Sequence, residues 1–559
     1  MDTQRLLLVV ALGLILFMLW DAWEKYQNPP APQAETVTGA ATPRGEGVPE
    51  ADSGGVPEAP RAGPTAMATA APRIGVLQYG DRVEVRTDVY HAVIDSHGGD
   101  LRIVDLLQYP VSLDEPDKPF RLMNDTLPRL FVAQSGFARR TQAQDGTLVA
   151  APNHATRFEV KQTRYELSEG QDALDVELFW TSPDGVRFSK RYTFRRGEYS
   201  IDVRYRVDNP TGHPWRGFYY QQLQRSGETV DLWLGTAYTY TGGVIYDAED
   251  KYQKISYDAM AEEPVNKTVT GGWIAMIQHY FLGAWVPSQD VRLNIYSLAL
   301  PEDRFVLGTK FLEETVVAPG ESRELANRLY VGPKLQHVLE KIAPGLELTV
   351  DYGILTIIAK PIFWLLEKIH AIVGNWGWAI VILTLLIKLA FYKLSETSYK
   401  SMAHMRKVQP RLVALKERYG GDKQKLNQAM MELYKKEKIN PLGGCLPILL
   451  QIPVFIALYW VLLESVELRQ APWILWIKDL STRDPYFVLP LLMGATMFIQ
   501  QKLNPAPVDP IQAKVMTFLP IVFTFFFLFF PSGLVLYWVV NNALSIVQQW
   551  YITNKVIKD

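Results

Sequence analysis

Five apolar segments lie close together in the last third of the chain, between Trp376 and Lys558. Each is near the length of about 20 residues that a helix needs to cross the hydrocarbon core of a bilayer. A sixth apolar segment, Leu6–Trp20, follows Arg5 and leads into aromatic residues rather than into a small-residue cleavage site. The sequence therefore predicts a polytopic α-helical membrane protein with six transmembrane helices, the first being a signal anchor in residues 1–27.

The average composition hides this apolar cluster, because charged residues make up 21% of the chain and the net charge is −2. A net charge so close to zero argues against nucleic acid as the main ligand of the whole chain. The single cysteine, Cys445, excludes an intramolecular disulfide framework and a metal site built from cysteines. A domain outside the cytoplasm therefore has to be stable through its hydrophobic core alone.

The long polar region after the first apolar segment divides into two parts. Residues 28–73 are rich in Pro, Ala, Gly and Thr, which predicts a disordered tether. If the preceding apolar segment were a cleaved signal peptide instead of an anchor, the rest of the architecture would be unchanged. Residues 74–345 alternate apolar and polar side chains, most clearly in Tyr199–Val207, and turn residues such as Arg196-Gly197 separate the segments. This pattern predicts a large antiparallel β-sandwich. Further strands are expected at Arg157–Leu167, Ala173–Trp180, Val186–Phe194, Gly217–Gln224, Trp273–Phe281 and Val291–Ala299.

Two helical regions follow the predicted sandwich. Pro333–Ile342 is expected to form a short helix, and residues 346–373 an amphipathic helix, interrupted by Pro361, that lies along the membrane surface. The remaining residues, 374–559, are expected to form a core of five transmembrane helices. Within this core, residues 395–439 are predicted to form a helical hairpin, because apolar side chains recur at helical spacing on both of its arms.

The predicted hairpin is strongly basic, with 12 Lys and Arg against 5 Asp and Glu between Lys393 and Lys438. This bias places it in the cytoplasm, together with both chain termini, and places the β-sandwich on the far side of the membrane. Its charges are those of a solvated surface, an anionic-lipid contact, or a docking site for ribosomal RNA or an acidic receptor. The candidate docking residues are Lys400, Arg406, Lys407, Arg411, Lys416, Arg418, Lys423 and Lys425.

Lys388 stands out within the second apolar segment, because a lysine at the centre of a membrane helix costs about 2.5–3.5 kcal/mol. Thr384 lies one helical turn away on the same face. We expect these polar side chains to line a wet cavity in the cytoplasmic half of the bilayer. The alternative is that Lys388 snorkels toward the cytoplasm, where Lys393 follows five residues later. Polar side chains within or at the ends of other spans are expected to converge on Lys388 and line the same cavity, with Gln451, Gln500 and Asn541 as candidate groove residues beside Gln501, Asn542, Gln548 and Gln549.

Four long motifs resemble the YidC membrane-protein insertases of Gram-negative bacteria. They are NPLGGCLPILLQIPVFIALYWVL (Asn440–Leu462), ELRQAPWILWIKDL (Glu467–Leu480), VLPLLMGATMFIQQK (Val488–Lys502) and FFPSGLVLYWVVNN (Phe529–Asn542). The order of signal anchor, large β-sandwich, surface helix and five-helix core is also that of the family. The resemblance covers the whole chain except the tether.

This resemblance implies a groove that is open to the cytoplasm and to lipid but closed to the periplasm. Lys388 matches the positive residue of that groove, which is arginine in many relatives, and Thr384 matches its threonine. Tyr537 and Trp538 match a tyrosine pair, so the second aromatic residue has no hydroxyl here. Lysine keeps the charge but lacks the planar fork of donors that arginine has.

The resemblance further implies a protein of the bacterial inner membrane that inserts, folds and helps assemble other membrane proteins, alone or with the Sec translocon. The implied partners are nascent membrane proteins, the ribosome, the Sec translocon, the signal-recognition-particle receptor and anionic lipid. No small-molecule substrate or cofactor is expected, and no G-x-x-x-x-G-K-[ST] nucleotide motif occurs in the sequence. Partitioning into lipid, rather than hydrolysis, would then drive insertion.

Two functions of other classes are the alternatives. A transporter of a small ligand would often show internal repeats in its spans, and the sequence shows none. An enzyme housed in the β-sandwich would need convergent acid–base residues, for which His91, Asp95 and His97 are the one cluster worth testing. Histidines this close together on a strand or turn are more often solvated or hydrogen-bonded locally.

Overall fold

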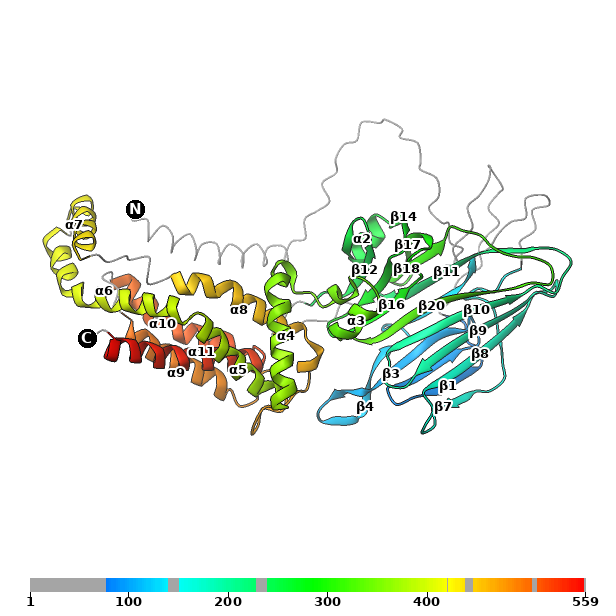
Figure 1. Ribbon diagram of the computed structural model, residues 1–559, viewed down its shortest axis with the longest axis horizontal. Helices are drawn as coiled ribbons and strands as arrows, with labels where there is room; N and C mark the ends of the chain where they lie inside the picture. The colour runs from blue at the N-terminus through cyan, green and yellow to red at the C-terminus, as the bar shows by residue number, and fades with distance from the viewer. Residues whose placement is uncertain are drawn as a thin grey trace, which may run out of the picture.

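The computed structural model describes residues 77–138, 150–227, 239–419, 421–437, 446–504 and 510–556. The predicted signal anchor and tether lie outside these residues, as does Cys445. Figure 1 shows a β-sandwich and a helical part side by side, with α4 (Thr356–Val373) between them.

Two sheets of mainly antiparallel strands form the sandwich. The first has eleven strands in the order β14-β17-β18-β11-β5-β3-β2-β1-β7, with β19 beside β11 and β4 beside β3. Its strands are β1 (Arg82–Arg86), β2 (Tyr90–Asp95), β3 (Asp100–Ser112), β4 (Glu115–Met123), β5 (Phe131–Ala138), β7 (Arg164–Glu166), β11 (Trp215–Ser226), β14 (Asn266–Thr270), β17 (Arg292–Leu300), β18 (Arg304–Phe311) and β19 (Thr315–Val317).

The second sheet has nine strands in the order β13-β12-β15-β16-β20-β10-β9-β8-β6. They are β6 (Glu159–Val160), β8 (Ala173–Thr181), β9 (Arg187–Arg195), β10 (Ser200–Asp208), β12 (Gly242–Asp247), β13 (Lys251–Ile255), β15 (Trp273–Ile277), β16 (Phe281–Val286) and β20 (Ser322–Pro333). Alternation along β9 and β10 buries every second side chain between the sheets. The predicted turn between these two strands is present, and Gly197 has a φ of 70° there.

Two predicted strands are wrong in their extent. Arg157–Leu167 forms two short strands in different sheets, β6 beside β8 and β7 beside β1. Each of the two strands lies at the edge of its sheet. The chain passes from one sheet to the other between β6 and β7, and the alternation of side chains does not reveal this change. Trp273–Phe281 turns after β15, where the Gln278 amide donates to the Phe281 carbonyl at 3.0 Å, and continues as β16. No glycine or proline marks this turn.

The rest of the described chain is mainly helical. Its helices are α2 (Tyr257–Glu262), α3 (Gln336–Ile342), η1 (Leu346–Thr349), η2 (Gly353–Leu355), α5 (Trp376–Ala390), α6 (Tyr392–Tyr419), α7 (Lys423–Lys436), α8 (Leu446–Glu464), η4 (Val466–Leu468), α9 (Val488–Leu503), α10 (Pro510–Phe527), α11 (Ser532–Tyr551) and η5 (Ile552–Val556). Each of the five apolar segments predicted in the last third of the chain is a helix.

Within the described ranges, no single helix is long and apolar enough to cross a membrane on its own. Helices α5 and α6 meet the requirement as a pair that is bent by 67°. The number of six transmembrane helices stays a prediction.

The β-sandwich is joined to the helical part by the segment after α8. Val466 packs in the hydrophobic core of the sandwich, and the His279 ring contacts the Leu463 carbonyl at 2.9 Å. The Arg469 guanidinium donates to the carbonyl of Pro110, on β3, at 2.7 Å. Hydrogen bonds to backbone carbonyls and a shared core therefore fix the sandwich against this end of the helical part.

Candidate functional site

Lys388 lies on α5, a helix whose start is tied to the loop between α8 and α9. The Asn375 side chain caps α5 by accepting from the Trp378 amide at 3.1 Å, and it donates to the Trp473 carbonyl at 3.2 Å. Gly377 lets Trp473 approach, because an added Cβ would lie 2.2 Å from the indole. Lys388 follows Gly377 by eleven residues, about 16 Å along the helix, and lies near the opposite end of α5.

The Lys388 side chain is buried, with 8% of its surface exposed, and it contacts α11. Its ammonium donates to the Ser545 hydroxyl at 2.7 Å, and Ser545 in turn donates to the Asn541 carbonyl at 2.7 Å. Within the described part of the chain, no carboxylate lies at ion-pairing distance from Lys388. A buried cation with one neutral hydroxyl partner has lost much of its hydration and gained little in exchange.

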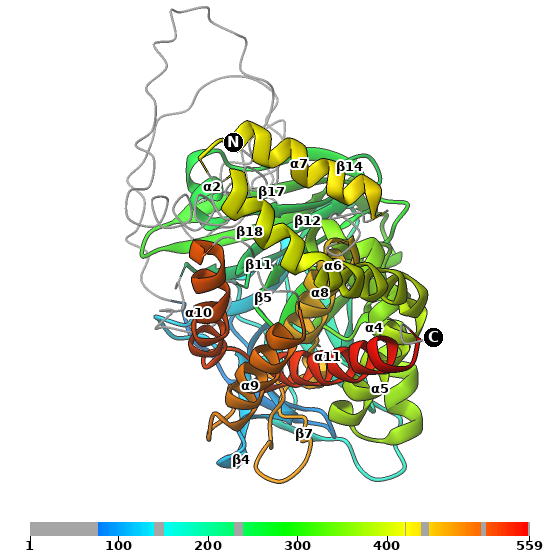
Figure 2. The same ribbon diagram turned by 90° about the vertical axis from the view of Figure 1, so that its left-hand side faces the viewer.

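Three predicted groove residues share faces with this contact. Thr384 is buried one turn before Lys388 and donates to the Ile380 carbonyl at 2.7 Å, a bond within its own helix. Tyr537 and Asn541 precede Ser545 by eight and four residues, so all three lie on one face of α11. Figure 2 shows α11 between α5 and α9, and it packs against both.

The two aromatic residues of α11 contact α8. The Tyr537 ring stacks on Phe455 with centroids 6.1 Å apart, and the Trp538 ring meets the same phenylalanine edge-on at 4.9 Å. The Trp538 indole nitrogen is buried without a hydrogen-bond partner in the described residues. Gln451, on α8, is half-buried.

Gln500 has its partners away from Lys388. It lies on α9 and donates to the Gln549 amide oxygen, while Gln549 donates to the Leu503 carbonyl at 3.1 Å. Asn542 donates to the hydroxyl of Thr496 at 3.3 Å. Thr496 lies one turn before Gln500 on α9, nearer the loop between α8 and α9. These bonds form a polar clamp between α9 and α11, which we call the α9–α11 clamp. Lys388 and Gln500 therefore bind different residues of α11, Ser545 and Gln549, which lie one helical turn apart.

The loop between α8 and α9 covers the end of the helical part that faces the sandwich. Its Asp484 accepts from the Leu489 amide at 2.7 Å and from the Trp476 indole at 3.0 Å. The amide of Gly533, at the start of α11, donates to the Leu480 carbonyl at 2.9 Å. Because its carbonyls and buried side chains are engaged by α9 and α11, the loop forms an ordered cap.

The predicted hairpin is present, and Figure 1 shows it at the opposite end of the helical part from the sandwich. Val408 and Leu412 on α6 pack against Met430 and Leu433 on α7, as their spacing predicted. Three of the basic residues predicted to dock partners form ion pairs: Lys400 with Glu396, Arg411 with Glu437 and Lys425 with Asp422. Arg406, Lys407 and Arg418 are exposed, and Lys416 is half-buried. The side chain of Lys423 lies outside the described residues.

The candidate acid–base cluster in the sandwich is divided among structural roles. His91 contacts Asp105 at 3.1 Å, and Arg121 binds the same carboxylate. Asp95 accepts from the amides of Gly80 and His97 at 2.7 and 2.8 Å, which closes a turn. These contacts occupy the His91 ring and the Asp95 carboxylate, while His97 takes part through its backbone amide.

Ser545 is the functional candidate that the sequence analysis missed. A serine near the end of an amphipathic helix is common and carries no signal by itself. Its position eight residues after Tyr537, on the same face as Asn541, would have marked it as a neighbour of the groove. That it meets Lys388 depends on how α5 and α11 pack.

The family model of the YidC periplasmic domain matches residues 82–365, and that of the 60Kd inner membrane protein matches residues 368–559. A membrane protein insertase YidC from Methylococcus capsulatus is 53% identical over 563 residues, which cover 100% of this chain and 99% of the relative. The same description belongs to a relative from Thioalkalivibrio sulfidiphilus that is 53% identical over 565 residues, with 100% and 99% covered. A crystal structure of active YidC insertase with its first transmembrane domain resolved aligns with a TM-score of 0.38 and 18% identity, over 85% of this chain and 94% of that one.

Proposed function

This chain belongs to the YidC family of membrane protein insertases, and we propose that it inserts its substrates through a polar groove between α5 and α11 that contains Lys388. The observation that carries this proposal is the buried ammonium of Lys388 with the Ser545 hydroxyl as its partner. A cation held in this way attracts an acidic group more strongly than an ion-paired or solvated one does, because the surroundings screen it weakly.

The groove would shorten the path of a substrate's polar tail through hydrocarbon. Acidic residues of the tail are drawn to Lys388, and the cap formed by the loop between α8 and α9 supports closure at the other end. Exposed apolar side chains such as Leu491 on α9 and Phe518 and Phe525 on α10 offer the substrate's apolar segment a surface continuous with lipid. Transfer of that segment into lipid is favourable by about 25 cal/mol per Å2 of apolar surface.

The topology that we propose places the hairpin and both termini in the cytoplasm and the β-sandwich in the periplasm. The opposite positions of the hairpin and the sandwich support it, as does the basic character of the hairpin. The exposed Arg406 and Lys407 make the hairpin a candidate docking surface for the ribosome, for the signal-recognition-particle receptor or for anionic lipid. Cooperation with the Sec translocon belongs to the same proposal.

The hairpin is tested by co-sedimentation of the reconstituted protein with translating ribosomes. Reversing both charges, in Arg406→Glu with Lys407→Glu, should weaken co-sedimentation at least about tenfold, since each lost phosphate contact adds to the loss. The reversal Lys161→Glu, on the exposed surface of the sandwich, is the control. Equal sedimentation of all three proteins would remove the ribosome from the proposal.

The groove is tested by insertion into liposomes that contain only this protein. The substrate is a single-span protein with an acidic amino-terminal tail, and protection of the tail from protease reports translocation. Lys388→Ala should lower the insertion rate by about tenfold or more, whereas Lys388→Arg keeps the charge and the rate. Lys393→Ala is the matched control, because Lys393 lies five residues on and is exposed in its pair with Glu396.

Three results decide the proposal. Loss of insertion in Lys388→Ala alone supports the charged groove, and a tail with its acidic residues neutralised should then be insensitive to the variant. Equal insertion by wild type and Lys388→Ala would show that the protein inserts its substrate without the charge of Lys388. Failure of wild type on a competent substrate would show that the protein acts only beside a translocon.

A further inference from the structure

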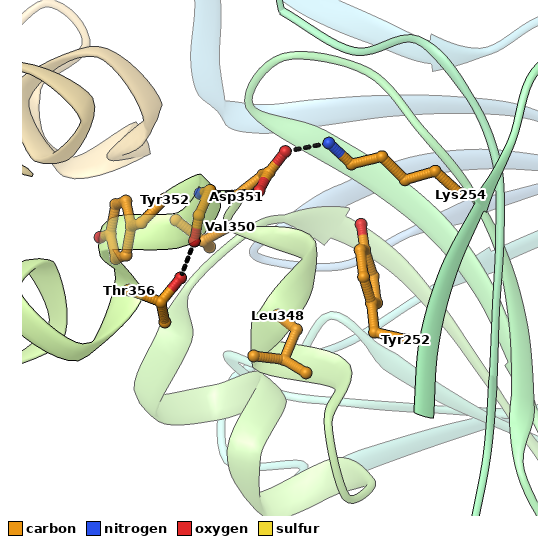
Figure 3. Close-up of a pocket in the computed structure, with 8 residues that line it drawn as sticks. Tyr252, Lys254, Leu348, Val350, Asp351, Tyr352 and Thr356 are labelled. Atoms are coloured by element: carbon orange, nitrogen blue, oxygen red, sulfur yellow. Dashed lines mark hydrogen bonds and ion pairs between the residues drawn. The ribbon is translucent and has the colours of Figure 1, made fainter. Parts of the chain in front are cut away.

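A cavity of about 380 Å3 lies where the β-sandwich meets the segment that leads into α4. Strand β13 forms one wall with Tyr252 and Lys254, and the chain from Leu348 to Thr356 forms the other. Figure 3 shows Tyr252 and Leu348 facing each other across the cavity, with Lys254 reaching to Asp351 at one side. The volume is in the range of about 300–1,000 Å3 that is typical of small-ligand sites.

The polar groups of the cavity are unevenly satisfied. Lys254 and Asp351 form an ion pair whose side chains are both partly exposed, and such pairs contribute little net free energy, so the pair opens easily. The Tyr252 hydroxyl is buried and has no hydrogen-bond partner in the described residues. A buried hydroxyl without a partner is unfavourable unless a ligand or water binds it. The cavity therefore offers a cation, an anion and a hydroxyl close together.

The charges that line the cavity balance, because Lys254 and Asp351 supply one cation and one anion. A purely anionic ligand would meet Asp351 as well as the lysine, whereas a ligand with one charge of each sign is matched on both sides.

An apolar surface begins directly at the cavity. Ile354 and Ile357 follow its wall and are 97% and 87% exposed. Along α4 this surface continues through Pro361 and Trp364 and, beyond the exposed Lys368, ends at Ile372, while the opposite stripe packs against the helical core. An apolar stripe of this length at the boundary between the sandwich and the predicted spans matches acyl chains of a bilayer.

We propose that this cavity binds the headgroup of a phospholipid that carries a phosphate and a primary ammonium, with the phosphate on Lys254 and the ammonium on Asp351. The Tyr252 hydroxyl donates to the phosphate, and the acyl chains lie along Ile354 and Ile357. The lipid is thereby held between the sandwich and α4. This site is separate from Lys388, so its test does not depend on the groove.

Native mass spectrometry of the full chain, released from vesicles with equal amounts of phosphatidylethanolamine, phosphatidylcholine and phosphatidylglycerol, tests the proposal. Wild type should retain phosphatidylethanolamine about tenfold over phosphatidylcholine, whose trimethylammonium cannot donate to Asp351. Lys254→Ala with Asp351→Ala should abolish that preference. The control removes another ion pair of the sandwich, in Arg164→Ala with Glu84→Ala, and should keep it.

A second variant guards against misfolding as the cause. Leu348→Trp fills the cavity and leaves both charges in place, so it should also abolish the preference, while an unchanged near-ultraviolet circular dichroism spectrum shows that the protein is folded. Equal retention of the three lipids by wild type, or an unchanged preference in both variants, would overturn the proposal. A preference for phosphatidylglycerol that needs only Lys254 would show an anionic-lipid site instead. Displacement of the lipid by soluble phosphoethanolamine at equal concentration would show that the acyl chains have no part in binding.

Discussion

The β-sandwich and the helical part each bury a lysine, and the two lysines are satisfied in different ways. Lys190, on β9, is fully buried, and its ammonium donates to the backbone carbonyls of Gly98 at 3.2 Å and Ser135 at 3.4 Å. It also lies over the rings of Tyr192 and Tyr205 at 5.4 and 5.3 Å. Lys190 therefore reaches fixed acceptors of the opposite sheet, in the turn between β2 and β3 and on β5.

Lys388 has the Ser545 hydroxyl as its partner, and a hydroxyl can rotate and donate elsewhere. The comparison shows how burial of the same residue type serves two purposes. A lysine bound by carbonyls and aromatic rings stabilises one arrangement of strands. A lysine bound by a single hydroxyl has donors left over, which the proposed groove would offer to a substrate. Four predictions test this distinction.

The largest effect is expected for Lys190→Ala, which leaves a cavity and two carbonyls without their donor. The free energy of unfolding of the sandwich should fall by about 3 kcal/mol. Thermal unfolding of the full chain, followed by near-ultraviolet circular dichroism, measures the change. Lys161→Ala, on the exposed surface, should change the stability by less than about 0.5 kcal/mol. An unaltered melting temperature in Lys190→Ala would mean that this lysine has no structural role.

A smaller effect of Lys190 depends on pH. Burial lowers the pKa of Lys190 from 10.5 to about 7, so between these values the unfolded chain holds a proton that the folded chain has released. Stability should therefore rise from pH 7 to pH 9, by on the order of 1–2 kcal/mol from this group. Lys190→Met, which is apolar and of similar length, should show a flatter profile over this range. Parallel profiles of wild type and variant would contradict the assignment.

Ser545→Ala should lower the insertion rate about threefold, since Lys388 stays charged but loses the hydroxyl that positions it. Ser545→Thr restores the hydroxyl and should restore the rate. Added to Lys388→Ala, the serine substitution should cause no further loss, because its effect passes through the lysine. Independent losses in the double variant would show that Ser545 acts on something else.

The smallest effect is expected in the α9–α11 clamp. Hydrogen bonds between membrane helices average about 0.6 kcal/mol, so Gln549→Leu should lower the thermal stability slightly and leave the insertion rate unchanged. A rate reduced as strongly as in Lys388→Ala would return Gln549 and its partner Gln500 to the groove, where the sequence analysis placed Gln500. Thermal unfolding and tail protection, measured on the same preparation, separate the two outcomes.

Local patterns were enough to predict most of the architecture. Alternation of apolar and polar residues predicted strands β8, β9 and β10 within a residue or two, and apolar runs predicted helices α5, α8, α9, α10 and α11. The spacing of Met405, Val408 and Leu412 predicted the face that packs in the hairpin. These features could be predicted because each depends on residues that are close together in the sequence, within a single strand or helix.

The sequence by itself determined that a lysine lies in an apolar helix and that a large β-sandwich precedes five apolar segments. Only the tertiary structure decided that Lys388 meets Ser545, which is 157 residues away, and that Gln500 binds Gln549 instead. It also decided that Val466 enters the core of the sandwich. The physical reason is that periodicity reports which face of an element is apolar, whereas the partner of a buried polar group depends on how distant elements pack.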